Sequence, residues 1–300
     1  MCGIVGLFIK SAHLRPELGG MLAAMTSTLC SRGPDSAGFA VYTAEIPGLV
    51  KLTLTSDVAG FDAGTLGDAL SRAIGVTRSV VSRHTHAVVT VPADRLTHAR
   101  KWLADHAAHI RVVSEGVGLE IYKDVGYPDD VARAFEIGDI EGTHGIAHTR
   151  MATESAVTTN GAHPFSTGRD QCLVHNGSLS NHASLRRELV RDGVAIETQN
   201  DSEVAAGYLT RELRRGRTLG QSLESSLSDL DGFFTFVVGT RTGFGVLRDP
   251  IACKPAVIAE TIDYVGFASE YRSLTCLPGI ARARVFEPKP ATPYFWEHQG

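Results

Sequence analysis

The sequence predicts an α+β protein, and three observations support this fold class. Short β-rich segments occur in runs, and the helical segments are gathered between these runs instead of alternating with single strands. Hydrophobic residues make up 43% of the 300 positions, which is enough for one large or two modest cores. The stretch 76–138 interrupts this arrangement with its own mixture of strand and helix patterns. We therefore predict a main domain made of residues 2–75 and 139–300, with 76–138 as a small inserted α/β subdomain.

The first part of the main domain is expected to begin with an apolar strand at 3–9. Helical spacing follows at 20–29, and a turn rich in Gly and Pro lies at 31–35. The next two segments, 38–43 and 50–55, alternate as strands do.

The insertion combines strand and helix patterns. An apolar segment at 87–91 precedes helical spacing at 96–110, and a strand-like stretch at 112–125 is broken by two glycines. Pro128 then opens a short helix. No chemical signature stands out in this stretch, and we expect it to be a docking surface for partner subunits.

The second part of the main domain is expected to contain three helices among short strands. Gly193 and Gly216 stand where two of these helices would end. The predicted helices are 181–191, 202–214 and about 219–230, and the predicted strands are 145–149, 172–175, 233–238, 243–247, 256–259 and 264–268.

Composition and charge argue against several classes of function. The formal net charge of −4 is small and spread along the chain, so neither a nucleic acid nor an anionic membrane surface is an expected partner. No basic run precedes the apolar N-terminus and no segment is long enough to span a bilayer. The five cysteines are scattered without a C-x-x-C pair. These features predict a cytoplasmic protein without disulfides, and with no metal site.

Cys2 is the first candidate catalytic residue. Removal of the initiator methionine would expose it, so that one residue carries both a thiol and an α-amino group. The α-amino pKa of about 7.7 to 8.0 lies close to the thiol pKa of about 8.5, so the amine can accept the thiol proton near neutral pH. The alternative is a small packed residue in an N-terminal strand.

Three further segments offer groups that could bind an amino-acid amide. Arg32 projects from a tight turn. Arg150 stands at the end of a predicted strand, and its planar guanidinium group can bind a carboxylate through two parallel hydrogen bonds. Asn176 and Gly177 supply an amide donor and an accessible backbone N–H, as an oxyanion hole requires. By local chemistry alone, 31–38 is an ordinary surface turn, and His175-Asn176-Gly177 is a hairpin turn.

Asp201 stands at a predicted helix start, where it could meet a substrate ammonium. The alternative is that Asp201 or Ser202 is simply the N-cap. Two histidine pairs, His84 with His86 and His106 with His109, have no third ligand at a recognisable spacing and predict no metal centre.

Taken in order, six motifs of the sequence resemble those of the class II glutamine amidotransferases, which are N-terminal nucleophile (Ntn) hydrolases. The six are Met1-Cys2-Gly3-Ile4-Val5-Gly6, the turn 31–38, His148-Thr149-Arg150, His163-Pro164-Phe165, His175-Asn176-Gly177 and Asp201. Three later segments, Arg248-Asp249-Pro250, Lys254-Pro255 and Ser269-Glu270, are similar as well. The resemblance covers nearly everything outside the insertion.

This resemblance implies a four-layer αββα sandwich and a role for each matching residue. Cys2 matches the nucleophile, and Asn176 with Gly177 matches the oxyanion hole. The residues that match glutamine-binding positions are Arg150 for the α-carboxylate, Asp201 for the α-ammonium, Arg32 in the closing turn and Thr153 in the pocket lining.

The run from Arg150 to Ser155, Arg-Met-Ala-Thr-Glu-Ser, most resembles the free-standing glutaminase subunits of split glutamate-synthase-like enzymes, including N-methylglutamate synthase. Because the chain ends at Gly300, we expect the ammonia-accepting synthase chemistry on separate subunits of a hetero-oligomer. The resemblance implies that flavin and an iron–sulfur cluster belong to those partners and that this chain carries no cofactor. Two alternatives are another Ntn amidohydrolase, acting on a different amide, and an inactive regulatory subunit.

Overall fold

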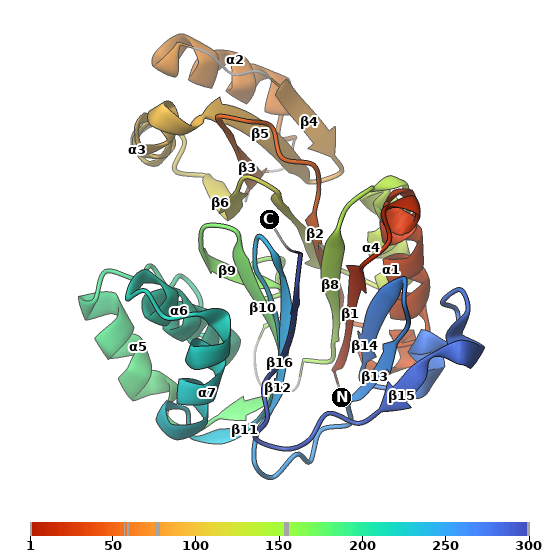
Figure 1. Ribbon diagram of the computed structural model, residues 1–300. Coiled ribbons are helices and arrows are strands. Elements are labelled where there is room, and N and C mark those ends of the chain that lie inside the picture. Colours follow the sequence, from red (N-terminus) through yellow and green to blue (C-terminus); the bar gives the residue numbers. More distant parts are fainter. Residues whose placement is uncertain (1, 57, 59, 76–78, 153–155, 299–300) are drawn as a thin grey trace.

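The computed structural model describes residues 2–56, 58, 60–75, 79–152 and 156–298. Within these ranges, two antiparallel sheets lie face to face, and each is covered on its outer side by helices (Figure 1). The four-layer αββα sandwich is therefore confirmed.

The layers are built from segments far apart in the chain. The seven-stranded sheet has the order β15 (Arg284–Phe286), β13 (Val257–Glu260), β14 (Tyr264–Ala268), β1 (Gly3–Ile9), β8 (His144–Arg150), β2 (Ser36–Tyr42), β7 (Leu119–Val125). The five-stranded sheet has the order β16 (Tyr294–Glu297), β12 (Gly243–Arg248), β11 (Gly232–Gly239), β10 (Gln171–Leu179), β9 (Phe165–Gly168). One outer layer holds α1 (Leu18–Ser27) and α4 (Pro128–Ala134); the other holds α5 (His182–Arg191), α6 (Asp201–Arg214) and α7 (Leu219–Asp229).

The uninterrupted apolar sequence of β1 explains why both faces of this strand are covered. Ile4 and Phe8 pack into the cluster between the two sheets, whereas Val5 and Leu7 face the helical side of the seven-stranded sheet. Successive strand residues point to opposite faces, so a strand apolar at every position is stable only when both faces are covered. All seven residues of β1 are buried, and this central strand carries Cys2 at its beginning.

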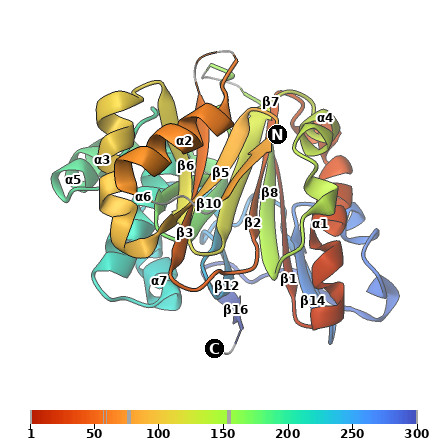
Figure 2. The ribbon, with the colours of Figure 1, turned by 90° about the horizontal axis from the view of Figure 1, so that it is seen from above.

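A third sheet, called the inserted sheet below, lies above the sandwich in Figure 1. Its strand order is β4 (Ser79–Arg83), β5 (His86–Pro92), β3 (Leu49–Ser56), β6 (Ile110–Gly116), and α2 (Ala63–Ile74) and α3 (Leu96–His106) cover one face (Figure 2). Val50, Leu52 and Val89 of this sheet share a separate apolar cluster with Leu70 of α2 and Leu103 of α3.

The strand pairings do not follow the predicted ranges 2–75, 76–138 and 139–300. β2 pairs with β7 from Ser36↔Val125 to Tyr42↔Leu119, so the chain leaves the seven-stranded sheet after Tyr42 and returns at Leu119. β3 and α2, expected in the main domain, pack in the inserted sheet instead. The alternating pattern of β3 would suit a strand of the main domain as well as a strand of the inserted sheet. Only its pairing partners show which sheet it belongs to. That the insertion is a separate subdomain stays a prediction.

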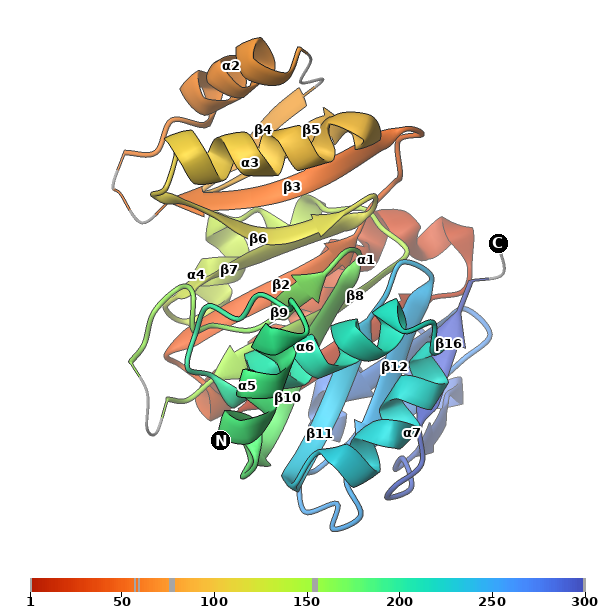
Figure 3. The ribbon, with the colours of Figure 1, turned by 90° about the vertical axis from the view of Figure 1, so that its left-hand side faces the viewer.

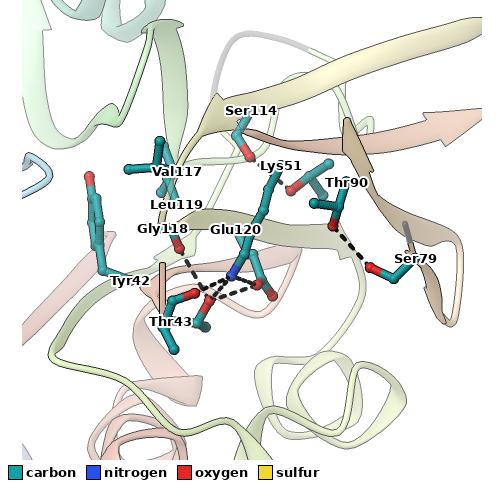
Figure 4. Close-up of polar contacts among 12 residues, drawn as sticks. Tyr42, Thr43, Lys51, Ser79, Thr90, Ser114, Val117, Gly118, Leu119 and Glu120 are labelled. Carbon is teal, nitrogen blue, oxygen red and sulfur yellow. Dashed lines mark hydrogen bonds and ion pairs between the residues drawn. The ribbon is translucent and has the colours of Figure 1, made fainter. Parts of the chain in front are cut away.

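A buried ion pair ties the inserted sheet to the sandwich. The Lys51 ammonium on β3 donates to Glu120 Oε1 on β7 at 2.8 Å, and it also contacts the hydroxyl of Thr43 (Figure 4). Both charged side chains are nearly buried, at 9% and 13% exposure. Removing one partner of such a pair typically costs about 3 to 5 kcal/mol, because the remaining charge is then buried without a partner.

Candidate active site

The start of β1 meets β8 and β10 at one end of the sandwich. Gly3 pairs with Thr149 on β8, so the next residues, Cys2 and Arg150, lie at the same end of these two strands. From the opposite sheet, the Asn176 side-chain amide donates to the Cys2 carbonyl oxygen at 3.3 Å. Cys2 is half-buried and Asn176 is buried. The structure thus brings together three of the residues predicted to form the site.

Arg32 reaches the same place from the turn before β2. Its Nε donates to the Cys2 carbonyl oxygen at 3.1 Å, and its Nη1 binds Glu270 Oε1 at 2.5 Å. The turn lies close to β8 because position 33 is glycine: a Cβ there would lie 2.5 Å from Arg150 N. The turn at 31–38 is therefore not an ordinary surface turn, since Arg32 points inward at Cys2.

Arg150 ends β8 and is 6% exposed. Its Nη1 donates to the Ala156 carbonyl oxygen at 3.4 Å, and its own carbonyl accepts from Asp35 N at 3.0 Å. The Asp35 carboxylate accepts from Ala152 N at 2.7 Å. The Arg150 guanidinium is therefore held against the segment that follows β8. Thr153, the other predicted binding residue of this segment, lies outside the described residues.

Asn176 and Gly177 lie inside a strand and not in a hairpin turn. β10 runs from Gln171 to Leu179 and pairs with β11 from Cys172↔Gly239 to Leu179↔Gly232, including Gly177↔Phe234. Glycine is required at 177 by close approach, because a Cβ would lie 2.0 Å from the Phe233 carbonyl oxygen. The hairpin interpretation is therefore wrong: the sheet fixes the backbone next to Cys2.

At the start of α6, the N-cap and the candidate ammonium-binding residue are two different residues. Asn200 is the N-cap, and its side chain accepts from Ser202 N at 2.9 Å. Asp201 is the first helical residue, and its carboxylate accepts from Leu179 N at 2.9 Å. The prediction that Asp201 or Ser202 is the cap is wrong, since the residue before them fills that position. The Asp201 side chain remains 23% exposed.

Three buried histidines lie behind Asn176. The rings of His148 and His163 stack with centroids 3.9 Å apart, and His148 Nε2 lies 3.1 Å from the His175 carbonyl oxygen. Burial lowers the pKa of His175 to about 4, although nearby Asp201 opposes the shift, and lowers that of His148 to about 3. Burial also holds the pKa of His163 well below its usual value. All three rings are therefore neutral at pH 7.

Sequence reasoning did not identify the tertiary roles of Glu270 and Ser269. Glu270 orients Arg32, and Ser269 Oγ accepts from Ile4 N at 2.9 Å at the beginning of β1. The resemblance had drawn attention to this pair only as a motif. No local pattern could link them to the N-terminus, because more than 200 residues separate the partners.

Among the described residues, no group of three or more His, Cys, Asp or Glu side chains is placed to hold a metal ion. In the same part of the chain, every helix is too short or too polar to cross a membrane.

Comparisons with known proteins identify the family of this chain. A family model described as a glutamine amidotransferase domain matches residues 148–276. The chain is 58% identical to a glutamine amidotransferase-like protein of Rhizobium meliloti, covering 100% of this chain and 99% of that protein. It is 32% identical to a protein of Methanothermobacter thermautotrophicus named "Putative glutamine amidotransferase", covering 91% and 93% of the two chains.

Two solved structures share the fold. The allosteric regulatory enzyme of purine biosynthesis matches with a TM-score of 0.64 at 20% identity, covering 99% of this chain and 47% of that one. Glutamine phosphoribosylpyrophosphate amidotransferase from B. subtilis matches with a TM-score of 0.60 at 19% identity, covering 99% and 49%. The chain thus spans about half the length of each, and the likeness at this identity concerns the fold alone.

Proposed function

This chain belongs to the glutamine amidotransferases, and from that premise we propose that it is a glutaminase subunit that supplies ammonia to a separate synthase. The observation that carries the proposal is the convergence of Arg32 and Asn176 on the backbone of Cys2. These two side chains come from different elements, the turn before β2 and the strand β10, and both donate to the Cys2 carbonyl oxygen, so the proposed oxyanion donor lies next to the proposed nucleophile.

In the proposed reaction, Cys2 is the N-terminal residue after methionine removal, and its α-amine takes the thiol proton. The thiolate attacks the side-chain carbonyl carbon of glutamine and forms a carbon–sulfur bond. Asn176 and Gly177 donate to the oxygen on which charge develops, the interaction that typically lowers such a barrier most. The protonated amine then gives its proton to the leaving nitrogen, and ammonia departs.

The γ-glutamyl thioester that remains is hydrolysed. Water adds to its carbonyl carbon, the carbon–sulfur bond breaks, and glutamate leaves while Cys2 recovers its proton. Splitting the reaction through a covalent intermediate replaces one high barrier with two lower ones.

Recognition of glutamine is proposed to rest on charge. Arg150 would bind the α-carboxylate and Asp201 the α-ammonium, while Arg32 would lie in the turn that closes near the substrate and Thr153 in the segment that lines the pocket. Arg150 and Arg32 lie beside Cys2 in the structure, and the partly exposed Asp201 carboxylate retains capacity for a further donor.

For the ammonia acceptor, we propose partner subunits of a glutamate-synthase-like enzyme such as N-methylglutamate synthase, which would carry the flavin and the iron–sulfur cluster. The support is the Arg-Met-Ala-Thr-Glu-Ser run that begins at Arg150. Copurification with the neighbouring subunits, followed by identification of the amino-acid product, tests this part separately.

The decisive experiment measures steady-state turnover of the purified chain on glutamine, asparagine and acylated amines. Preference for glutamine, together with an intact mass lacking the initiator methionine, supports the proposal. Preference for an acylated amine would make the chain a different Ntn amidohydrolase. Retained methionine with no turnover on any substrate would make it a regulatory subunit.

A further inference from the structure

A pocket lies between the inserted sheet and the helical layer of the five-stranded sheet. Its volume is about 420 Å³, and its lining residues come mainly from α3, β6, β9 and α6. Figure 3 shows α3 and β6 on one side of this region, and β9 and α6 on the other. Its lining includes none of Cys2, Arg32, Arg150, Asn176 and Asp201, so it is distinct from the candidate active site. The volume is in the range of small-molecule sites.

Cationic side chains predominate in this lining. They are Arg100, Arg111, Lys123, Arg169 and Arg214, against three glutamates. Two of the glutamates pair within the pocket: Arg100 binds Glu115 at 2.7 Å and Arg111 binds Glu197 at 3.4 Å.

The third glutamate, Glu203, is bound by backbone N–H groups of the loop before α6. The Glu203 carboxylate accepts from Glu197 N at 2.8 Å and from Thr198 N at 2.6 Å.

Arg169 and Arg214 are both exposed, and neither makes an ion pair with another residue that the structure describes. The lining therefore has two positive charges in excess, and two guanidinium groups available to an anion.

Gln171, a buried residue with an amide side chain, also lines this pocket. Gln171 is 3% exposed, and its Oε1 accepts from the Thr210 hydroxyl at 2.5 Å. Its Nε2 has no hydrogen-bond partner among the described residues. A buried donor without an acceptor is energetically unfavourable. An acceptor atom from a bound molecule would remove that cost.

The pocket is preformed because Asp170 fastens its two walls together. Asp170 N donates to the Glu115 carbonyl oxygen at 2.8 Å, and its carboxylate accepts from Val117 N at 2.9 Å and Gly118 N at 3.1 Å. The turn between β6 and β7 is thereby fixed to the turn between β9 and β10. Little ordering is then required on binding, which favours affinity.

We propose that this pocket binds a small organic anion, through a phosphate or carboxylate group that accepts from Gln171 Nε2 and from the guanidinium groups of Arg169 and Arg214. Guanidinium forks and amide donors match both oxyanions, and the excess positive charge attracts either.

Lys123 connects this pocket to the candidate active site. Its ammonium donates to the carbonyl oxygens of Ala162 at 2.8 Å and Pro164 at 3.2 Å, on either side of His163. His163 in turn stacks on His148, which contacts the carbonyl next to Asn176. An anion near Lys123 would compete for its ammonium, so binding is expected to alter glutamine turnover.

Binding is tested by isothermal titration of the full chain with inorganic phosphate, pyrophosphate and succinate, at ionic strength held constant with sodium chloride. We expect saturable one-to-one binding of at least one probe. Pyrophosphate and succinate distinguish a phosphate site from a dicarboxylate site. Gln171→Glu and Arg214→Glu should each weaken binding at least tenfold, which corresponds to about 1.4 kcal/mol.

Arg187→Glu is the matched control, because Arg187 is an exposed arginine on α5 that does not line the pocket. It should bind like the wild type. The proposal is overturned if no probe binds, or if Arg187→Glu weakens binding as much as Arg214→Glu does. If Gln171→Glu fails to fold, the exposed Arg214 variant still decides the outcome.

A second measurement, which rests on the proposed glutaminase function, compares KM and kcat for glutamine with and without the bound probe. A change that is lost in Arg214→Glu supports coupling through Lys123. Binding without any kinetic change would overturn the coupling and leave the binding site standing.

Discussion

The side-chain amide of Asn176 donates to the backbone carbonyl of Cys2 at 3.3 Å, across 174 positions of sequence. The two residues belong to opposite sheets of the sandwich, so their meeting depends on how the sheets pack and not on either strand alone. This contact places a potential oxyanion donor next to a potential nucleophile, and the predictions below start from it.

Cys2→Ala is expected to abolish glutamine hydrolysis while leaving the fold intact. The thiol has no substitute in the proposed chemistry, and Cys2 is only half-buried, so its truncation removes little packing. Glutamate release and thermal unfolding measure the two effects. Activity above background with a correctly processed N-terminus would remove Cys2 from the mechanism.

Asn176→Asp is expected to lower kcat by about 100- to 1000-fold with a smaller change in KM, because it replaces an oxyanion donor with an acceptor of the same shape. Steady-state kinetics on glutamine provide the measurement. An equal rise in KM with unchanged kcat would mean that Asn176 binds the ground state instead.

Asp201→Asn is expected to raise KM for glutamine, because it removes the charge proposed to meet the α-ammonium. The hydrogen bond from Leu179 N can persist to the amide oxygen, so stability should change little. Asn200→Ala is the matched control: loss of this N-cap should cost about 1 kcal/mol of unfolding free energy while KM stays the same. If both variants lose stability and neither shifts KM, Asp201 has only a structural role.

Glu270→Gln is expected to lower kcat/KM by about fivefold, the equivalent of about 1 kcal/mol, because it weakens the hold on Arg32 beside Cys2. Arg272→Gln provides the comparison, since Arg272 pairs at 2.6 Å with Oε2 of Glu270, whereas Arg32 binds Oε1. Similar losses of kcat/KM in the two variants would mean that any change in the ion pairs of Glu270 lowers activity, and not the loss of its contact with Arg32 in particular.

Stability is expected to fall as the pH drops below about 6.5. The folded-state pKa values of His175 and His148, about 4 and 3, lie below the ordinary histidine value of 6.5, so the unfolded chain takes up protons first. The stability that each neutral ring contributes is present above pH 6.5 and is lost toward its folded pKa. Between pH 7 and pH 5, each should cost about 2 kcal/mol.

His148→Gln tests this origin, because glutamine can still donate to the His175 carbonyl but does not titrate. Urea unfolding at pH 7 and pH 5 should show a difference about 2 kcal/mol smaller than in the wild type. An unchanged pH dependence would assign the effect to other groups.

Much of the candidate site could be predicted because its residues stand in short motifs with distinct chemistry. The sequence placed Cys2 before an apolar strand and Asn176 with Gly177 near another, and the structure brings Cys2 and Asn176 together. The helix cap was missed by one position, since Asn, Asp and Ser at 200–202 are all good caps and only the side-chain orientation selects Asn200. The ion pair of Arg32 with Glu270 left no local signal at all.

Elements were predicted best where the pattern is local. The helices α5, α6 and α7 were predicted close to their observed bounds, since their periodicity and terminal glycines act within a few residues. The helix α2 was missed, because Gly64 and Gly67 weaken its propensity, and its stability comes from packing on the inserted sheet. The short strands β15 and β16 were missed because they are defined by pairing with neighbours.

By itself, the sequence determined the α+β class, the apolar central strand and the order of motifs that identifies the family, because these depend on side-chain periodicity and on residue types at fixed spacing. Only the tertiary structure decided that β3 joins the inserted sheet, that His175-Asn176-Gly177 is strand and not turn, and that Glu270 orients Arg32. The physical reason is that a strand's pattern records which face is buried but not which partner covers it. That partner is selected by burial and hydrogen bonding across the whole folded chain.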